Sequence, residues 1–434
     1  MLLIFVPQQT NRLDYVFRHI FGERLGIVFR LCTNKIDFQE YKGMKIAYGM
    51  DFSDVPFIEA KALLFEEDIH KQDLQIGEIQ DNKVLFKNTT EDFLGFDIFA
   101  ACFYCLSRYE EYLCAETDYI GRFMPENSWA FVHNCLDKAM VDRWIVLLKE
   151  KLLSVFPSLE IKEPEFEYLP TYDIDIAYCY KHKGFLLSVA GLAKQFFRFD
   201  FQGIKKRIEV LLGKKQDPYD NFDYLENIHK KYNLQAVYFF LVAQQRSRYD
   251  KNTSIKNKDF QQIIANVAQQ NQIGWHASFQ SFENSDLQQQ EIDFLQKCTQ
   301  KTISKNRFHY LHFCLPNSYN SLISNNIKED YSMGYASVLG WRASTCSSFW
   351  FFDLKRNTQT TLRVYPLFCM ENQLSKIKKE ELILNQLHKA IQEVKKHNGV
   401  FVSLFHQQSF SQNEFHDWQT IYESMLKLVC EDNN

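Results

Sequence analysis

The sequence is poor in glycine and lacks the glycine-rich motifs that bind phosphate groups. Only 15 of its 434 residues are glycine, and neither a P-loop nor a dinucleotide-binding fingerprint occurs. Internal repeats and low-complexity tracts are also missing. We therefore do not expect a nucleotide or phosphate to be bound against a glycine-rich loop.

The sequence also lacks an apolar run that could span a bilayer. The longest weakly charged stretch, residues 184–193, is much shorter than the roughly 20 residues that a membrane helix needs. Residues 1–7 lack the basic start and cleavage site of a signal peptide and are expected to form a first strand. The formal net charge of -4 provides no basic field for nucleic acid or an anionic membrane. We expect a soluble, cytoplasmic protein with no nucleic-acid partner and no transmembrane segment.

The cysteines do not form the pattern of a disulfide framework. There are eleven, an odd number, scattered from Cys32 to Cys430, which is typical of reduced thiols in the cytoplasm. One Cys-x-x-Cys pair occurs, Cys102 and Cys105, but it lies inside an apolar run and no second pair accompanies it. These two cysteines are expected to be buried on a helix and not to form a redox pair or half of a zinc site.

Length and composition predict a globular protein of two domains. With 46% hydrophobic and 24% charged residues, the chain can bury large cores, and its length exceeds that of one ordinary domain. Pro157, Pro164 and Pro170 fall close together, which excludes a continuous helix through that segment. We place the boundary there, between an N-terminal α/β domain of residues 1–156 and a second domain of residues 165–434.

The hydrophobic pattern differs between the two parts. In the first, we expect strands at 2–6, 27–31 and 45–48 and helices at 12–21, 96–112 and 139–155. In the second, we expect strands at 236–242, 273–278, 308–313, 362–368 and 400–405, alternating with helices at 221–232, 259–270, 286–299 and 376–397. Alternating strands and helices indicate a parallel sheet covered by helices, either open or closed into a barrel. In both forms, chemistry gathers where strands end.

The most informative segment is Thr171-Tyr172-Asp173-Ile174-Asp175. In a strand, Asp173 and Asp175 lie on one face, and two desolvated carboxylates side by side repel each other. A cation, an arginine or shared protons must stabilise them, and paired carboxylates can divide base work from metal binding. The alternative is a strand that ends in an ordinary aspartate turn.

Further polar residues fall at the ends of other expected strands. His276 lies beside Ser278, Arg307 comes at the start of the next strand with Tyr310 on the opposite face, and His406 follows an apolar strand. A single histidine at a strand end is usually structural. Two histidines and an aspartate pair on separate strands match the needs of metal-assisted hydrolysis: a carboxylate base, a metal site and a protonated histidine for the leaving group.

The order of these motifs resembles that of the polysaccharide deacetylase family, the NodB homology domain. The motifs that carry the resemblance are Thr171 to Asp175, Gly274 to Ser278, Arg307 to Tyr310 and Leu404 to His406. Further segments are similar to a bacterial branch of the family with an additional N-terminal domain of unknown function: residues 330–335, 340–346, 351–354, 96–99 and 107–112. The similarity extends over nearly the whole chain.

The resemblance implies an α/β fold with a distorted (β/α) barrel of the polysaccharide deacetylase type after a smaller α/β domain. It also implies a hydrolase that removes acetyl or other acyl groups from a carbohydrate. By the same resemblance, Asp173 would be the base that activates water, oriented by Arg307, and His406 would be the general acid. Asp175 and His276 would bind a divalent metal, zinc foremost, which polarises the acyl oxygen. The sugar, the bond type and the oligomeric state stay open.

The chain departs from the family pattern at the expected second histidine ligand. That position, four residues after His276, is occupied by Gln280, which is a poor zinc ligand. His309 and His312 could supply the missing nitrogen, but three positions apart in a strand they are expected to point to opposite faces. The alternative function is a catalytically degenerate barrel that binds a glycan or a partner protein without turnover.

Several residues are candidates for contacts with the substrate: Tyr310, Trp341 and Arg342. Arg342 could hold an acidic group of the substrate or pair with Asp330 or Asp353. A third possibility for the whole chain is an unrelated intracellular amidohydrolase built on the same barrel, because a fold does not determine a function.

Overall fold

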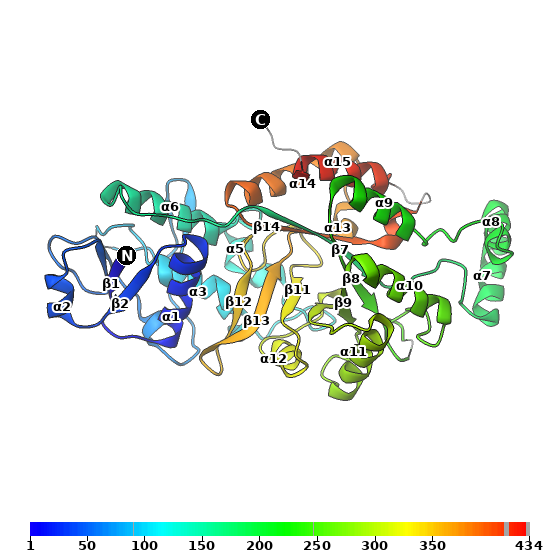
Figure 1. Cartoon of the computed structure of the whole chain (residues 1–434), viewed down its shortest axis with the longest axis horizontal. Helices are drawn as coiled ribbons and strands as arrows, with labels where there is room; N and C mark the ends of the chain where they lie inside the picture. Colours follow the sequence, from blue (N-terminus) through cyan, green and yellow to red (C-terminus); the bar gives the residue numbers. More distant parts are fainter. Residues whose placement is uncertain (90, 246, 412–415, 431–434) are drawn as a thin grey trace.

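The structure is a computed structural model that describes residues 1–89, 91–245, 247–411 and 416–430. Within these residues the strands form a four-stranded sheet, an eight-stranded sheet and a two-stranded ribbon. The four-stranded sheet belongs to the N-terminal part, at the left of Figure 1, and the eight-stranded sheet lies in the middle of the molecule.

The N-terminal sheet has the order β2-β1-β3-β4, and all its neighbours are parallel. Its strands are β1 (Leu2–Phe5), β2 (Phe29–Cys32), β3 (Lys45–Tyr48) and β4 (Phe57–Ile58). The main helices beside it are α1 (Asn11–Phe17), which continues as a π-helix over Arg18–Arg24, α3 (Ile98–Leu106) and α6 (Met140–Val155). Every residue of β1 is buried, because both faces of the sheet are covered. Cys102 and Cys105 are free and buried on α3, as the sequence predicts.

The helix predicted for residues 96–112 is broken, so that expectation is wrong in part. Helix α3 ends at Leu106, and a second helix, α4 (Tyr109–Leu113), follows it. Arg108 between them has a left-handed backbone, with a φ of 56°. The turn is stabilised because the buried Arg108 side chain forms ion pairs with Glu110 and Glu111.

The eight-stranded sheet has the order β12-β13-β11-β10-β9-β8-β7-β14 and curls into a half barrel. Its parallel strands are β7 (Glu167–Ile174), β8 (Val237–Leu241), β9 (Gln272–Ala277), β10 (Lys305–Phe308), β11 (Glu329–Met333), β13 (Thr358–Pro366) and β14 (Val400–His406). The edge strand β12 (Phe349–Asp353) is antiparallel to β13. The predicted α/β architecture, a distorted barrel that follows a smaller α/β part, is confirmed.

Helices connect the parallel strands and cover the outside of the curl. They are α9 (Phe222–Tyr232), α10 (Lys258–Gln270), α11 (Ser285–Thr299), α12 (Asn317–Ser324), α14 (Glu380–Lys396) and α15 (Trp418–Cys430). Alternate residues of β8 and β14, among them Phe239 and Leu404, form a separate apolar cluster, while Phe240 and Phe405 join the main core. This alternation fills the inside of the curl with side chains and leaves the strand ends as the place for polar groups.

The strand predicted at residues 308–313 is misplaced. Strand β10 ends at Phe308, and a short 3-10 turn, His309–Leu311, follows it with Tyr310 at a φ of 61°. Two contacts stabilise this turn: His309 Nδ1 lies 3.0 Å from Asp250 Oδ1, and Arg122 Nη1 donates to the Tyr310 carbonyl at 2.7 Å. The strand therefore ends five residues earlier than its composition suggests.

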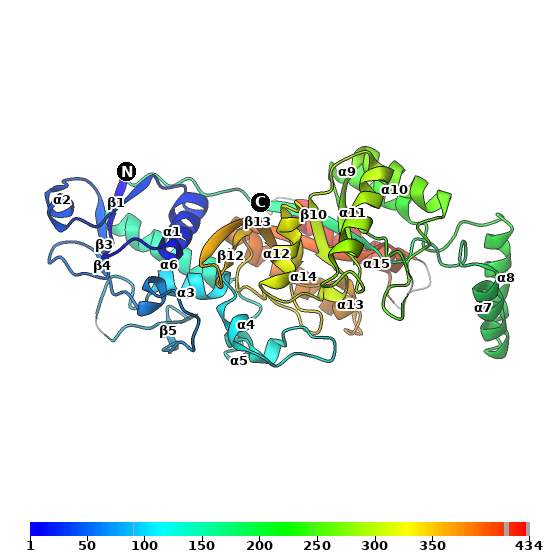
Figure 2. The same ribbon diagram turned by 90° about the horizontal axis from the view of Figure 1, so that it is seen from below.

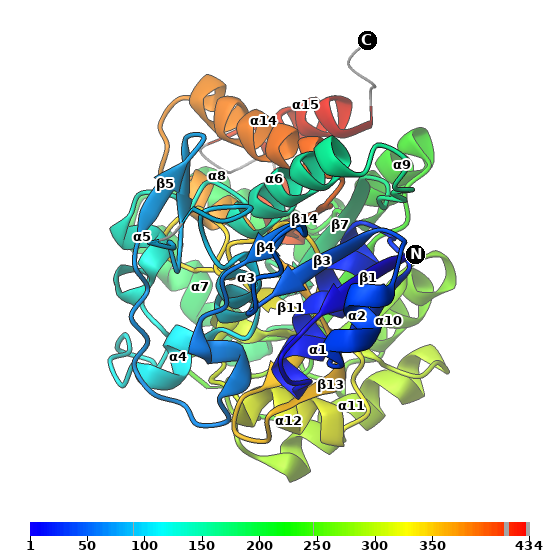
Figure 3. The same ribbon diagram turned by 90° about the vertical axis from the view of Figure 1, so that its left-hand side faces the viewer.

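The two parts of the chain pack closely against each other. One hydrophobic core runs through both, and the Phe352 ring of β12 lies 5.1 Å from the rings of Tyr15 and Phe103. Figure 3 shows α6 beside α14, where Arg143 pairs with Glu393. The proline-rich segment, residues 156–166, is described throughout and forms neither helix nor strand. The proposed domain boundary there stays a prediction.

None of the helices in the described part of the chain is both long and apolar enough to cross a membrane.

Candidate active site

The site lies where five neighbouring parallel strands end. β14, β7, β8, β9 and β10 are adjacent, and their register pairs His406 with Asp173 and Arg307 with His276. Because the strands are parallel, their carboxyl ends meet at one edge of the sheet. The polar residues that the sequence places on separate strands are therefore neighbours in space, although their roles stay predictions.

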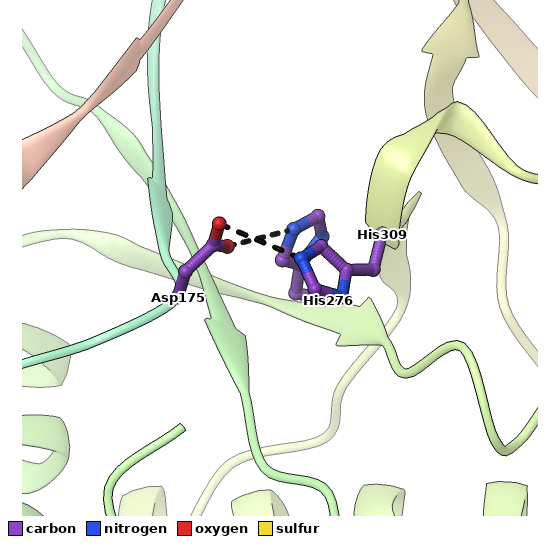
Figure 4. A group of neighbouring side chains, drawn as sticks. All are labelled: Asp175, His276 and His309. Carbon is purple, nitrogen blue, oxygen red and sulfur yellow. Dashed lines mark ion pairs between the residues drawn. The ribbon is translucent and has the colours of Figure 1, made fainter. Parts of the chain in front are cut away.

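Asp175, His276 and His309 form a candidate metal centre. Their ligating atoms all lie within 4.8 Å of one another. The two Asp175 oxygens face the two imidazoles: Oδ1 is 3.2 Å from His276 Nε2, and Oδ2 is 3.5 Å from His309 Nε2 (Figure 4). Asp175 directly follows β7, His276 lies on β9, and His309 follows β10.

Hydrogen bonds on the far side of each ring fix the orientation of the two imidazoles. His276 Nδ1 lies 2.8 Å from the Arg307 carbonyl, and His309 Nδ1 lies 3.0 Å from Asp250. A carbonyl and a carboxylate only accept hydrogen bonds, so each Nδ1 carries a hydrogen. When a ring is neutral, its lone pair is therefore on Nε2, the atom that faces Asp175.

The donor set fits a divalent metal such as zinc. Asp175 Oδ1 and His276 Nε2 are buried and have no hydrogen-bond partner among the described residues, and such orphaned atoms require an explanation. Two imidazole nitrogens and one carboxylate oxygen are the protein ligands of one known class of catalytic zinc site, which leaves a coordination position open. Burial disfavours a proton on His309, but the charges of Asp175 and Asp250 outweigh it and raise its pKa to about 9. Metal binding here would therefore release a proton.

Arg307 holds the other carboxylate of the pair. Its Nη1 donates to Asp173 Oδ1 at 2.8 Å, and its Nε donates to the Tyr331 carbonyl at 3.0 Å. Arg307 is completely buried over the ring of Phe239, with 4.5 Å to the centroid. Asp173 Oδ2 lies 3.7 Å from His276 Nε2. One oxygen of Asp173 is thus fixed, and the other faces the metal centre.

His406 ends β14 and is paired with Glu371. Its Nδ1 is 2.6 Å from Glu371 Oε1, which also accepts a hydrogen bond from Ser409, and its Nε2 is 3.5 Å from Asp175 Oδ2. Burial disfavours the imidazolium, but Glu371 and Asp175 outweigh burial and raise the pKa of His406 to about 10. His406 is therefore protonated at neutral pH, as a proton donor must be.

The three predicted substrate residues occupy different environments. Tyr310 is 41% exposed at the mouth of the site, whereas Trp341 is completely buried against Phe368 and Arg342 is almost completely buried. Their contacts with a substrate stay predictions.

The predicted pairing of Arg342 with Asp330 or Asp353 is wrong. Arg342 donates two hydrogen bonds to Glu111, at 2.8 and 2.6 Å. Asp330 instead accepts hydrogen bonds from Asn306, Tyr319 and Ser332. The ion-pair partner of Arg342 therefore comes from the N-terminal part of the chain and not from the barrel.

A cavity of about 270 Å³ separates an N-terminal loop from the barrel, next to the turn that carries His309. Its lining residues include Tyr119, Arg122, Leu311, Tyr335 and Arg342. Arg122 also donates to the carbonyl of Tyr310. The N-terminal part thus forms one wall beside the candidate site.

Sequence reasoning did not assign three residues of this site: His309, Asp250 and Glu371. The turn at 309–311 directs His309 toward Asp175, while His312 stacks on Phe279 with 4.5 Å between the rings. The sequence analysis expected His309 and His312 to point to opposite faces of an extended strand, which argued against either as a metal ligand. That expectation is wrong, because residues 309–311 form a turn. Asp250 and Glu371 follow no motif, and only their positions in space relate them to His309 and His406.

The Gln280 backbone N–H donates to Asp250 at 3.1 Å, and that of Phe279 does so at 2.8 Å. Asp250 therefore connects the loop after β9 to the imidazole of His309.

Comparisons with known proteins give a family match for the first part of the chain only. Residues 2–157 match a family of unknown function, DUF7033. No curated protein matches the sequence.

Several solved structures are similar to part of the chain, among them the following three. A protein from Mycobacterium smegmatis, provisionally described as a polysaccharide deacetylase, has 10% identity and a TM-score of 0.40, over 62% of this chain and 85% of that one. A polysaccharide deacetylase from Bacillus cereus has 10% identity and a TM-score of 0.30, over 61% and 86%. A CE4 family pseudoenzyme from Bacillus anthracis has 10% identity and a TM-score of 0.30, over 62% and 63%. Likeness at this level does not transfer an activity to this chain.

Proposed function

We propose that this protein is a metal-assisted hydrolase that removes acyl groups, acetyl foremost, from a carbohydrate. One observation carries the proposal: the Asp175–His276–His309 group lies between a carboxylate held by Arg307 and an imidazolium held by Glu371. We further propose that residues 165–434 form the catalytic barrel and that residues 1–156 are a separate domain against it.

In this proposal, Asp175, His276 and His309 would hold a divalent ion, which would polarise the acyl oxygen. Asp173 removes a proton from water as the water oxygen bonds to the acyl carbon. The Asp173 carboxylate is held in position by Arg307, whose Nη1 lies 2.8 Å from Asp173 Oδ1. His406 then gives a proton to the departing nitrogen or oxygen as the bond from the acyl carbon to that atom breaks. The products are a carboxylic acid and a free amine or hydroxyl on the sugar.

Aromatic side chains at the mouth support a carbohydrate as the substrate class. The Tyr249 and Phe279 rings stack with 4.0 Å between centroids, and the partly exposed Tyr310 ring lies 5.8 Å from Tyr249. Apolar ring faces beside a polar centre suit a sugar, whose ring presents apolar faces and polar edges. The left-handed backbone of Tyr310 is costly for an aromatic residue and is the kind of strain that is concentrated at functional sites.

The alternative, a barrel that binds a glycan or a partner protein without turnover, depended on Gln280. In the described structure His309 offers an imidazole nitrogen beside Asp175 and His276, which supports the hydrolase over this alternative. The two proposals still differ in a measurable way, because only a hydrolase releases acetate.

The test is acetate release by zinc-loaded protein from acetylated amino-sugar oligomers and from O-acetylated xylan. We expect release from at least one, and a loss of roughly 10²–10⁴-fold in Asp173→Asn and in His406→Gln, as is typical of acid–base groups. Asp286→Asn and His388→Gln, at exposed positions, are the matched controls and should keep full activity. Undiminished release by Asp173→Asn would remove the base assignment. Zinc binding without acetate release from either substrate would favour the non-hydrolytic alternative.

A further inference from the structure

A helical hairpin projects from the barrel between β7 and α9. It consists of α7 (Phe185–Phe197) and α8 (Phe201–Leu211), and in Figures 1 and 2 it stands apart from the body of the molecule. The structure describes both helices completely, with no buried residue in α7 and one, Val210, in α8. The hairpin therefore contributes almost nothing to the core of the protein.

The polar side of α7 faces α8. Arg207 of α8 donates a hydrogen bond to the Gln195 side chain at 2.7 Å. A Cβ atom at Gly191 would come within 2.7 Å of the Arg207 guanidinium, so a larger residue there would displace the end of the Arg207 side chain. Gly191 and Gln195 are four residues apart and share one face of the helix. The contact between the two helices thus combines this hydrogen bond with the Phe196 and Phe201 rings, whose centroids lie 6.4 Å apart.

The apolar side of α7 faces solvent. Phe185, Val189 and Phe196 follow one another at helical spacing, with Leu186 and Phe197 beside them. Phe185 is 81% exposed, Leu186 82% and Phe197 79%. The turn and α8 add exposed Phe199, Phe201 and Leu212. A helix on a soluble protein normally buries its apolar side, so this hairpin has the reverse arrangement and exposes a patch that requires a covering partner.

The hairpin and its flanks are strongly basic. Residues 181–215 contain nine lysines and arginines but only two acids, Asp200 and Glu209, whereas the whole chain has a net charge of -4. Lys194, Arg198 and Lys205 are exposed next to the apolar side chains. The net charge of the chain predicted no anionic membrane partner, but positive charge is concentrated in this segment. Two hairpins packed against each other would bring these positive segments together, so charge disfavours that arrangement.

We propose that the α7–α8 hairpin docks the protein on an anionic lipid bilayer. Exposed phenylalanine and leucine with flanking lysine and arginine is the composition of helices that lie in the membrane interface. The apolar side chains would enter the boundary between headgroups and acyl chains, and the basic residues would contact lipid phosphates. A 13-residue helix is about 20 Å long and too short to cross the bilayer, so the attachment is peripheral. This proposal does not depend on the proposed hydrolase activity.

The test is sedimentation of the full chain with vesicles of phosphatidylcholine alone or with about one third phosphatidylglycerol. We expect binding to the anionic vesicles, at least tenfold weaker binding to the neutral ones, and release at high salt. Phe185→Ser/Phe197→Ser and Lys205→Glu/Lys206→Glu should each reduce binding at least tenfold. Val28→Ser/Ile36→Ser and Lys378→Glu/Lys379→Glu, at exposed sites outside the hairpin, are matched controls and should bind like the wild type. Thermal unfolding checks that all four variants are folded.

Three results would overturn the proposal. The first is no binding of the folded wild type to either vesicle. The second is anionic-vesicle binding that both hairpin variants retain, because another surface would then be responsible. The third is a stable dimer in light scattering that Phe185→Ser/Phe197→Ser converts to monomer, without vesicle binding by the wild type, because a second copy would then cover the hairpin.

Discussion

His309 Nε2 lies 3.5 Å from Asp175 Oδ2, and together with His276 this pair forms a group that could hold a metal ion. The second imidazole of this group comes from the turn after β10, and not from the position of Gln280. Since Asp250 fixes the ring from its other side at 3.0 Å, the imidazole is oriented before any ion binds.

Replacing His309 by alanine should weaken zinc binding at least a hundredfold. The change removes one of three protein ligands, whereas loss of a residue that only orients a ligand typically costs about 10–100-fold. Calorimetric titration of metal-free protein with zinc measures the effect. His312→Ala is the matched control, because His312 is also buried but stacks on Phe279. Equal zinc affinity in His309→Ala and the wild type would rule out this metal centre.

Replacing Glu371 by glutamine should move the alkaline limb of the activity profile to lower pH. Glu371 stabilises the imidazolium of His406, whose pKa is raised to about 10. Without this charge, His406 loses its proton at lower pH, and the shift should reach about one unit or more. The pH dependence of kcat/KM measures it.

The control for that shift is Ser409→Ala. Ser409 donates to the same oxygen of Glu371 at 3.0 Å, but its removal leaves the charge in place, so the limb should stay near its wild-type position. A uniform loss of rate in Glu371→Gln, with the limb unmoved, would contradict the assigned relation between Glu371 and His406.

Replacing Arg342 by methionine should lower the free energy of unfolding by about 3 kcal/mol. This is the lower end of the range of about 3–5 kcal/mol for breaking a buried pair, because Arg108 still contacts Glu111 at 2.8 Å. The double change Glu111→Gln/Arg342→Met should cost less than the sum of the single changes. Guanidinium-induced unfolding measures all three variants. Lys230→Met, which breaks an exposed pair with Glu226, should cost no more than about 1 kcal/mol; a similarly small effect of Arg342→Met would refute the prediction.

Acid should destabilise the contact between α6 and α14 through Glu393. Burial opposes its charge, but His397 and Arg143 outweigh burial and lower the pKa of Glu393 to about 2. A depressed pKa stabilises the folded state above the unfolded-state pKa of about 4.3, and this contribution is lost as the pH falls toward 2. The thermal unfolding temperature should therefore fall more steeply between pH 7 and pH 3 in the wild type than in Glu393→Gln. The control is Glu381→Gln, at an exposed position, whose unfolding temperature should change with pH as in the wild type. If the curve of Glu393→Gln also ran parallel to that of the wild type, Glu393 would contribute nothing to the acid sensitivity.

The apolar strands of the barrel were predictable because their pattern is local. The strand expected at 400–405 is β14, and that expected at 236–242 is β8, each within one residue at either end. Strand β11 (Glu329–Met333) was not predicted, because its charged residues conceal a buried strand. Asp330 can lie there only because Asn306, Tyr319 and Ser332 satisfy its oxygens, and two of these partners come from other elements.

Residues of the candidate site were predictable where they lie next to an apolar strand in the sequence. They were not predictable where only contacts between distant segments bring them into the site. Asp173, Asp175, His276 and His406 each follow or end an apolar run. Glu371 does not follow such an expected strand, and only its position in space places it beside His406. The same limit applies to residues 184–193, whose apolar character was plain, although no periodicity shows whether a helix face is covered.

The contact of Phe352 with Tyr15 and Phe103 has a consequence for how such a chain can evolve. The rings that cover this edge strand and the strand itself are encoded by separate portions of the gene. A recombination event that exchanged either portion for a homologue from another lineage would leave an aromatic side chain without its neighbours. The two portions should therefore be inherited together, and their substitutions along this seam should be correlated.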